Sequence, residues 1–525
     1  MRLVSDGPDI PPDLIAAQQR GDVLFVCGAG VSFKAGLPGF RSLTERVYAG
    51  LGEDWNPHHA EREVMVEGGE LAGQYDRAFR CLERRLAAGD LPRAQSMRRR
   101  IRDQVRAALQ PAPDADLANH VTVLNLSRDS EGSTRLLTTN FDCLFEQAWN
   151  TRFGSAIASH AGQAMPRPKG IEFSGVLHLH GRIGNDLLGL EATDLVLTSA
   201  EFGDAYLRNG WASRYLYDLA RTHSLVLVGY QADDPPMRYL LEALEADRER
   251  YPDLKPVYAF VGVGQDDREL QQALWQAKGI HPICYPKGPQ NDHAALYATL
   301  GAWVHSVDDP RSWRRERLSE LLAGDPASVS EEDLGDVVRL LSDLPASEQL
   351  ADVDPPAGWL PILDKRGAFA EGRACPGPWI VRRIADPAMI RACAAGVNLD
   401  GRTWWQIDHA LENAPSELSA EQRKAWKLIR RAAQDRSTAF HRGWWELRHQ
   451  LRSGDADYDL RQAVARAFRP RLRVHEPIEW PTGSPAESRP VTLSRLVRVD
   501  FADPTHAPRP QEVLDAWPVQ AASEA

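Results

Sequence analysis

The sequence predicts an α/β fold, in which a Rossmann-like parallel sheet with helices on both faces carries a helical insertion and precedes a mainly α-helical C-terminal domain. Three features of the chain lead to this prediction. Short apolar runs recur between glycines and polar turns, a pattern typical of buried parallel strands. Amphipathic stretches of helical length separate these runs. Beyond about residue 310 the strand-like runs fade, and helical segments alternate with polar linkers.

A short helix over residues 11–20 is expected to lead into the first strand, Val23 to Cys27. Later strands are expected at 134–138, 176–179, 224–228, 256–261 and 281–285, with intervening helices at 143–149, 211–221 and 237–250. The charged helical stretch at about 45–118 interrupts this alternation and predicts a helical insertion; its arginines at 98–100 and 102 favour a solvated helix face over a phosphate site. We therefore expect one domain over residues 1–308 and a second over 309–525.

Composition narrows the class of protein. The 525 residues are 43% apolar and 26% charged, as in soluble globular proteins, and the net charge of −11 argues against a constitutive nucleic-acid binder. No apolar run approaches the roughly 20 residues that span a bilayer, and the N-terminus lacks the basic start and apolar run of a secretory signal. A cytoplasmic protein with no membrane partner is expected. The six cysteines include no CxxC pair, so no metal site is expected.

A glycine-rich turn, Gly28-Ala29-Gly30-Val31-Ser32, directly follows the first predicted strand. Such a turn lets the backbone approach a pyrophosphate, whose charge a helix N-terminus stabilises. The third glycine of the usual dinucleotide fingerprint is absent, and no clear ribose-binding acid follows about 20 residues on, which disfavours an ordinary dinucleotide oxidoreductase. A second turn at residues 35–41 predicts a loop that folds over a ligand.

Polar residues also follow three other predicted strands. Asn140 and Asp142 follow the strand at 134–138, where they are suited either to holding a small polar group or to capping the next helix. His180 follows the strand at 176–179, where it is suited to acting as a general base or a hydrogen-bonding orienter. Gly229 and Tyr230 follow the strand at 224–228. The carboxyl ends of parallel strands are where ligands bind in such sheets.

In their order and spacing, GAGVS…GLPGF, TTNFD, HLHGRIG, VLTSAEF and VGYQADDP resemble the sirtuin-like (silent information regulator) superfamily over about residues 10–306. The chain looks most like the bacterial antiphage-defence branch, which hydrolyses NAD. The resemblance implies that Asn140, Asp142 and His180 are the catalytic residues. It also implies that NAD contacts come from Gly28, Ala29, Gly30, Ser32, Phe40, Thr139, Gly229 and Tyr230.

Two departures from the deacetylating sirtuins bear on the reaction. Those enzymes carry two zinc-binding cysteine pairs between the histidine-glycine strand and the next glycine loop, whereas residues 182–228 here contain no cysteine. The zinc module that helps to form the acyl-lysine groove is therefore missing from the sequence. In addition, Gly39 stands before Phe40 where an aspartate is common, and Gln231 follows Tyr230 where serine is usual.

These features favour an NAD glycohydrolase (NADase) that cleaves NAD to nicotinamide and ADP-ribose without a metal and depletes cellular NAD as the effector of an antiphage system. One alternative is an NAD-dependent protein deacylase or ADP-ribosyltransferase, which would require an acyl or acceptor substrate. Another is a non-catalytic NAD or ADP-ribose sensor that controls assembly. Residues 309–525 are expected to serve autoinhibition, self-assembly or trigger recognition. The resemblance implies a homo-oligomer that acts with a partner such as a HerA-type ATPase or short Argonaute, or responds to a phage protein.

Overall fold

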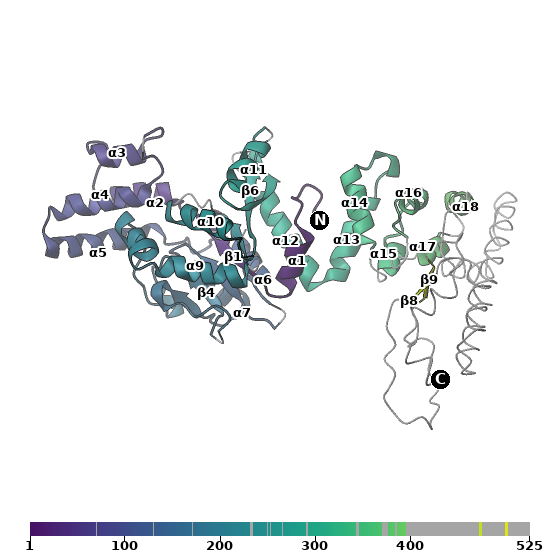
Figure 1. Cartoon of the computed structure of the whole chain (residues 1–525), viewed down its shortest axis with the longest axis horizontal. Helices are drawn as coiled ribbons and strands as arrows, with labels where there is room; N and C mark the ends of the chain where they lie inside the picture. The colour runs from purple at the N-terminus through teal and green to yellow at the C-terminus, as the bar shows by residue number, and fades with distance from the viewer. Residues whose placement is uncertain are drawn as a thin grey trace, which may run out of the picture. The chain divides into compact units, whose positions relative to one another are not determined.

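The computed structural model describes residues 1–394, with gaps at 70, 130, 171, 231–234, 249, 252–253, 265, 290–291, 343–345, 370–375 and 384–385, and two short strands further on (Figure 1). The chain divides into two compact units, Met1–Asp308 and Asp309–Ala525.

The first unit is built on a seven-stranded sheet in which every strand pair is parallel, with the order β3-β4-β2-β1-β5-β6-β7. The strands are β1 (Val23–Cys27), β2 (Arg135–Thr138), β3 (Ser159–Ala161), β4 (Gly175–His178), β5 (Ser224–Val228), β6 (Val257–Val263) and β7 (His281–Pro286). Strands β2, β3 and β4 lie on one side of β1, and the later strands β5, β6 and β7 lie on its other side. This order confirms the predicted Rossmann-like parallel sheet and creates a topological switch point between β1 and β5.

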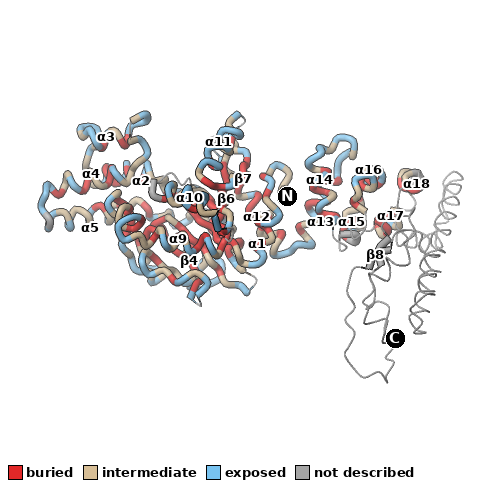
Figure 2. The backbone as a smooth tube through the Cα atoms, viewed as in Figure 1, coloured by how far each residue is buried: buried red, intermediate tan, exposed pale blue. Residues whose placement is uncertain are grey.

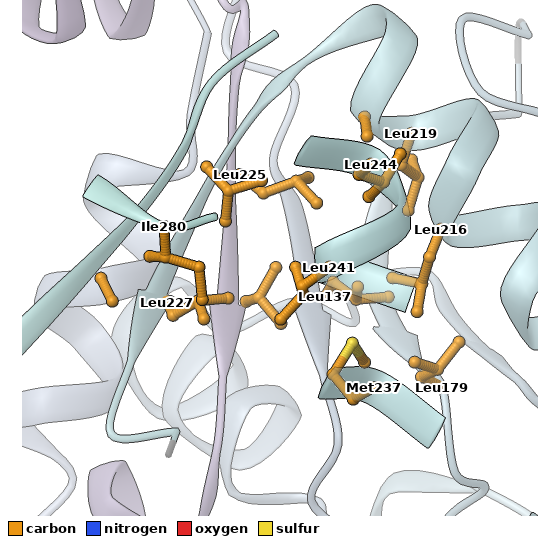
Figure 3. Close-up of a cluster of buried hydrophobic side chains, with 14 of the residues drawn as sticks. Leu137, Leu179, Leu216, Leu219, Leu225, Leu227, Met237, Leu241, Leu244 and Ile280 are labelled. Atoms are coloured by element: carbon orange, nitrogen blue, oxygen red, sulfur yellow. The ribbon is translucent and has the colours of Figure 1, made fainter. Parts of the chain in front are cut away.

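Both faces of the sheet are covered, because alternate residues of β1 pack into different cores. Leu24 and Val26 belong to a buried cluster with α9 (Trp211–Thr222) and α10 (Pro235–Arg248), and Figure 3 shows leucines of these helices beside Leu225 and Leu227 of β5. On the other side, the Phe25 ring meets the buried Trp303 ring edge-on at 5.9 Å between centroids. Trp303 lies in α12 (Ala294–Asp308), which contacts α6 (Ala118–Leu126). Helix α6 in turn contacts α7 (Leu144–Phe153). Helix α1 (Pro12–Gln19) contacts β1.

The predicted insertion is helical and begins slightly earlier than expected. It consists of α2 (Phe40–Leu51), α3 (His59–Met65), α4 (Tyr75–Ala87) and α5 (Leu91–Ala108). Buried Val47, Phe79 and Val105 share one core, while Figure 2 shows much of the α3–α5 segment exposed. The basic run on α5 engages acidic side chains: Arg98 pairs with Glu83, and Arg102 with Asp194 and Glu201.

The described part of the second unit is mainly helical, as predicted. Its helices are α13 (Pro310–Leu322), α14 (Glu331–Leu340), α15 (Ala346–Val353), α16 (Trp359–Lys365), α17 (Gly377–Arg382) and α18 (Pro387–Ala394). The buried Trp359 donates its indole N–H to the Leu322 carbonyl at 3.1 Å, which joins α16 to the end of α13. An antiparallel pair, β8 (Leu472–Val474) and β9 (Val499–Phe501), is an element that the sequence did not predict.

Among the described residues, no helix combines the length and apolar character needed to cross a membrane.

Candidate active site

Four neighbouring strands end at the same edge of the sheet. The register pairs Cys27 of β1 with both Thr138 of β2 and Val228 of β5, and it pairs Thr138 with His178 of β4. The segments that follow these paired residues are the four that the sequence singled out. Parallel strands therefore bring the glycine turn, Asn140, His180 and Gly229 to one edge, next to the switch point where ligands bind in open α/β sheets.

The loops after β1 and β5 approach each other so closely that side chains would not fit between them. The Gly28 and Gly30 amides donate to the carbonyls of Val228 and Gly229, each at 3.0 Å. A Cβ on Gly28 would lie 2.6 Å from the Gly229 oxygen, and one on Gly30 would lie 2.8 Å from the Gly229 Cα. Gly229 itself has a φ of +60°. The packing of the two loops requires these glycines, whether or not a phosphate approaches them.

The remaining residues expected near a nucleotide lie on these same two loops. Ala29 begins a short 3-10 turn, Ala29–Ser32, and is half-buried. Tyr230 is half-buried and packs against the core under α9 and α10. Gln231, the departure noted next to it, lies outside the described residues.

Ser32 is the centre of a buried polar cluster. Its hydroxyl lies 3.2 Å from each of three side-chain atoms: Asn140 Nδ2, Asp142 Oδ2 and His120 Nε2. All four side chains are at most 7% exposed. The Ser32 hydroxyl accepts from Asn140 and donates to Asp142, so Ser32 joins the glycine turn to the end of β2.

The contacts of Asn140 determine which way its amide faces. Nδ2 donates to the Gly28 carbonyl at 3.2 Å and to the Ser32 hydroxyl at 3.2 Å. A carbonyl oxygen only accepts, so the NH₂ group must face Gly28 and both of its protons are used. The amide oxygen, Oδ1, is left to accept a hydrogen bond from a ligand or water.

Asp142 serves the local fold at the same position. Oδ1 accepts from the Leu144 amide at 3.1 Å at the start of α7, which is the helix-capping role considered from the sequence, while Oδ2 accepts from Ser32. Burial raises the pKa of the Asp142 carboxyl. Its expected role in holding a small polar group of a ligand stays a prediction.

His180 is buried against aromatic side chains. Its Nε2 lies 2.7 Å from the Tyr206 hydroxyl, and its ring meets the Phe202 ring edge-on at 5.0 Å. Tyr206 lies in a π-helical segment, Gly203–Arg208, that follows α8 (Ser199–Phe202). Burial lowers the pKa of His180 from 6.5 to about 3, so the ring is neutral near pH 7. A neutral ring donates through one nitrogen and accepts through the other, which suits it to orienting a hydroxyl.

Phe40 and Thr139 occupy different surroundings from the buried cluster. Thr139 is half-buried and hydrogen-bonds Cys27 through its amide at 3.0 Å. Phe40 begins α2, and its ring lies 5.8 Å from that of Tyr75 and 5.9 Å from that of Phe79. It also lines an open groove of about 610 Å³, whose walls are residues 33, 36–42, 46 and 75. The groove is formed mainly by the second turn and the start of α2, and Asn140, Asp142 and His180 are not among its lining residues.

Three contributors to the site were not identified from the sequence. His120 of α6 contacts Ser32, Tyr206 contacts His180, and Tyr297 of α12 donates to the Gly30 carbonyl at 3.4 Å. Burial lowers the pKa of His120 to about 4. Tyr206 follows the VLTSAEF motif by only a few residues, which was the one available signal; His120 and Tyr297 lie in ordinary helical sequence.

Among the described residues, no group of three or more histidine, cysteine, aspartate or glutamate side chains is arranged to hold a metal ion.

Residues 134–283 match the family model described as the SIR2-like domain. The match runs from β2 into β7 and includes Asn140, Asp142, His180 and Gly229. It supports the resemblance to the sirtuin-like superfamily for this part of the chain.

A curated protein and a solved structure are also similar to the chain. An uncharacterized protein of Sinorhizobium fredii is 36% identical over 513 residues; the alignment covers 95% of this chain and 40% of that relative, so the chain spans less than half of the relative's length. A structure titled "Structural Basis for the Mechanism and Regulation of Sir2 Enzymes" is 14% identical, covers 58% of this chain and all of its own, and has a TM-score of 0.28.

Proposed function

We propose that the first unit is an NAD glycohydrolase that cleaves NAD to nicotinamide and ADP-ribose. The observation that carries the proposal is the orientation of Asn140. Its NH₂ group is held by Gly28 and Ser32, so that Oδ1 is the acceptor left at the carboxyl edge of the sheet, on the strand next to that of His180. An acceptor held in this way orients a water molecule or ribose hydroxyl without rearrangement.

Cleavage of NAD needs few further groups from the protein. The nicotinamide of NAD is positively charged and leaves with the electrons of the broken N-glycosidic bond, while the ribose carbon gains oxocarbenium character and takes up water. In this scheme Oδ1 of Asn140 accepts a hydrogen bond from that water and directs the oxygen lone pair of the water at the carbon. The lost proton passes to solvent. His180, neutral and bound to Tyr206, orients the ribose hydroxyls; its lowered pKa favours this role over that of general base.

The composition of residues 182–228 favours hydrolysis over protein deacylation as the reaction. They contain no cysteine, and the described residues there form α8, the π-helical segment and α9 in place of a zinc module. The test is to incubate the protein with NAD, with and without an acetylated peptide, and to separate the products by chromatography. Release of nicotinamide and ADP-ribose without peptide supports the proposal. Peptide-dependent release identifies a deacylase, and NAD binding without turnover identifies a sensor.

The role of this activity in antiphage defence is a further part of the proposal, and it rests on the resemblance of the sequence motifs. Cells that express the wild-type chain are expected to lose NAD on infection, whereas cells that express Asn140→Ala are not. Equal NAD levels in both infected cultures would contradict this role. Recovery of the chain from infected cells would then show whether a HerA-type ATPase, a short Argonaute or a phage protein accompanies it.

We propose that residues 309–525 control the activity, and the boundary at Asp308 defines the fragment that tests this. A fragment of residues 1–308 that cleaves NAD faster than the full chain would show autoinhibition. An inactive monomeric fragment of a full chain that is oligomeric and active would show that assembly through the second unit activates the enzyme.

A further inference from the structure

A second histidine, distinct from His180, is buried with a glutamate behind Asn140. His178 is the last residue of β4 and Glu146 lies in α7; their side chains are 0% and 3% exposed. The His178 Nε2 lies 2.7 Å from the Glu146 Oε1, and the Ser159 hydroxyl donates to the same oxygen. A buried carboxylate is costly unless it is paired in this way.

The other nitrogen of His178 contacts the candidate catalytic residue. Nδ1 lies 3.1 Å from the main-chain oxygen of Asn140. Beyond Thr138 the chain has left the β2 ladder, so this carbonyl depends on a donor other than a backbone amide of the ladder. The ring of His178 supplies that donor to the main chain of Asn140, while Gly28 and Ser32 hold its side chain.

These two contacts indicate the charge of the ring. A carbonyl oxygen and an ionised carboxylate are both acceptors only, so with Glu146 ionised each nitrogen of His178 must carry a proton. Burial, the largest single influence, opposes the resulting charge, but the charge and hydrogen bond of Glu146 together with the Asn140 carbonyl and Asp142 exceed it, and the pKa of His178 is raised. Burial alone would raise the pKa of Glu146, but the charge and hydrogen bond of His178 and the hydrogen bonds of Ser159 and the backbone together lower it.

We propose that the His178–Glu146 pair is the positioning element that holds Asn140 for cleavage of the nicotinamide–ribose bond, with His178 carrying both ring protons. This inference rests on the proposed NAD glycohydrolase activity. Loss of one ring proton leaves either the Asn140 carbonyl without this donor or Glu146 with only that of Ser159. Activity is therefore lost as the pH rises through the pKa of His178, and the loss appears in kcat.

Other charged or titratable groups face this pair from every neighbouring element. Asp142 and Cys143 lie in the loop before α7, and His120 lies on α6. Arg182, in the loop after β4, donates to the Ser159 hydroxyl on β3 at 3.1 Å. Burial keeps the thiol of Cys143 protonated by raising its pKa, and it keeps His120 neutral by lowering its pKa to about 4. Neither group is therefore expected to produce an alkaline limb near neutral pH.

The first measurement reads the charge of the ring directly. The full chain is labelled with ¹⁵N at its histidines, and the His178 signals are assigned by their absence in His178→Gln. We expect a doubly protonated ring at pH 7 in the wild type and a neutral ring in Glu146→Gln. His223 is the matched neutral control: it is 3% exposed, lies next to the amino end of β5, and has a pKa lowered by burial to about 4. A neutral His178 ring in the wild type overturns the proposal.

The second measurement is the pH profile of NAD cleavage. In the wild type, the alkaline limb of kcat must coincide with the pKa of His178 found in the spectra. In Glu146→Gln we expect this limb about one pH unit or more lower, because an opposite charge at this distance shifts a pKa by about that much. We also expect kcat to fall about tenfold or more with a smaller change in KM, while His223→Gln follows the wild type.

Wild-type measurements decide the matter if Glu146→Gln fails to fold. A doubly protonated His178 whose pKa differs from the alkaline limb refutes the positioning role, as does an unchanged kcat profile in a folded Glu146→Gln. A chain that binds NAD but releases no nicotinamide refutes the proposed function and the role built on it, whereas the spectra still establish the charge of the pair.

Discussion

Lowering the pH from 7 to 5 is predicted to destabilise the wild-type chain relative to His180→Gln. Burial lowers the pKa of the folded His180 from 6.5 to about 3. At pH 5 the unfolded ring therefore binds a proton that the folded ring does not. Because the folded pKa is the lower one, stability is present above the unfolded value of 6.5 and is lost as the pH falls below it toward 3.

The size of the effect follows from the pH interval that matters. About 1.5 of the 2 pH units lie below the unfolded pKa, and each unit is worth about 1.4 kcal/mol, so the wild type should lose about 2 kcal/mol relative to the variant. Other titrating groups are common to both proteins and cancel in the difference. His180→Gln retains an amide that is able to reach the Tyr206 hydroxyl, so the loss of that hydrogen bond adds little at either pH.

The assay is urea unfolding of both proteins at pH 7, 6 and 5, followed by circular dichroism. The difference between their unfolding free energies should change steadily across this series. If it stays constant, then His180 titrates in the folded state as it does in the unfolded one, and the assignment of a neutral buried ring to the site is wrong.

Three further substitutions test the contacts around the site. Gly28→Ala places a methyl group against the facing loop and should cost about 1–3 kcal/mol in thermal or urea unfolding, while Gly301→Ala, with nothing within 4 Å of its new Cβ, should cost nothing; equal effects would contradict the close approach of the loops. Ser32→Ala leaves its three buried partners without their shared hydroxyl and should cost about 1–3 kcal/mol in the same assay; a fully stable variant would show that the cluster has other partners. Tyr206→Phe keeps the ring but leaves the buried His180 Nε2 without that partner, so it should cost about 1–3 kcal/mol in unfolding, and kcat of the folded variant for NAD cleavage should fall about tenfold; an unchanged kcat would remove Tyr206 from the site.

Much of the first unit was predictable because its strands are short apolar runs between turn residues. The runs at 23–27 and 224–228 became β1 and β5 with the same bounds, and the helix at 11–20 became α1 (Pro12–Gln19). The strand β3 was missed because Ser159–Ala161 has only three residues and no β-branched side chain. It forms through pairing with the edge of β4, a tertiary effect that no local pattern reveals.

The candidate site was predictable only in part. Motifs at strand ends identify Asn140 and His180, since the carboxyl ends of parallel strands meet at one edge. The role of His178 was not foreseen, because a histidine at the end of an apolar strand gives no sign of its partner. That partner, Glu146, lies on a helix 32 residues earlier. His120 was missed for the same reason: it reaches Ser32 across 88 residues of sequence. Such pairs follow from packing between elements, and neither periodicity nor motif spacing encodes them.

If Asn140 holds the water that attacks NAD, replacing it must slow the release of nicotinamide from NAD alone. The wild type is compared with Asn140→Ala and with Asn150→Ala, which changes an exposed residue of α7. We expect Asn150→Ala to release nicotinamide and ADP-ribose at the wild-type rate. We expect Asn140→Ala to release them more slowly by about two orders of magnitude or more. Release by a folded Asn140→Ala at the wild-type rate would show that Asn140 does not hold the attacking water.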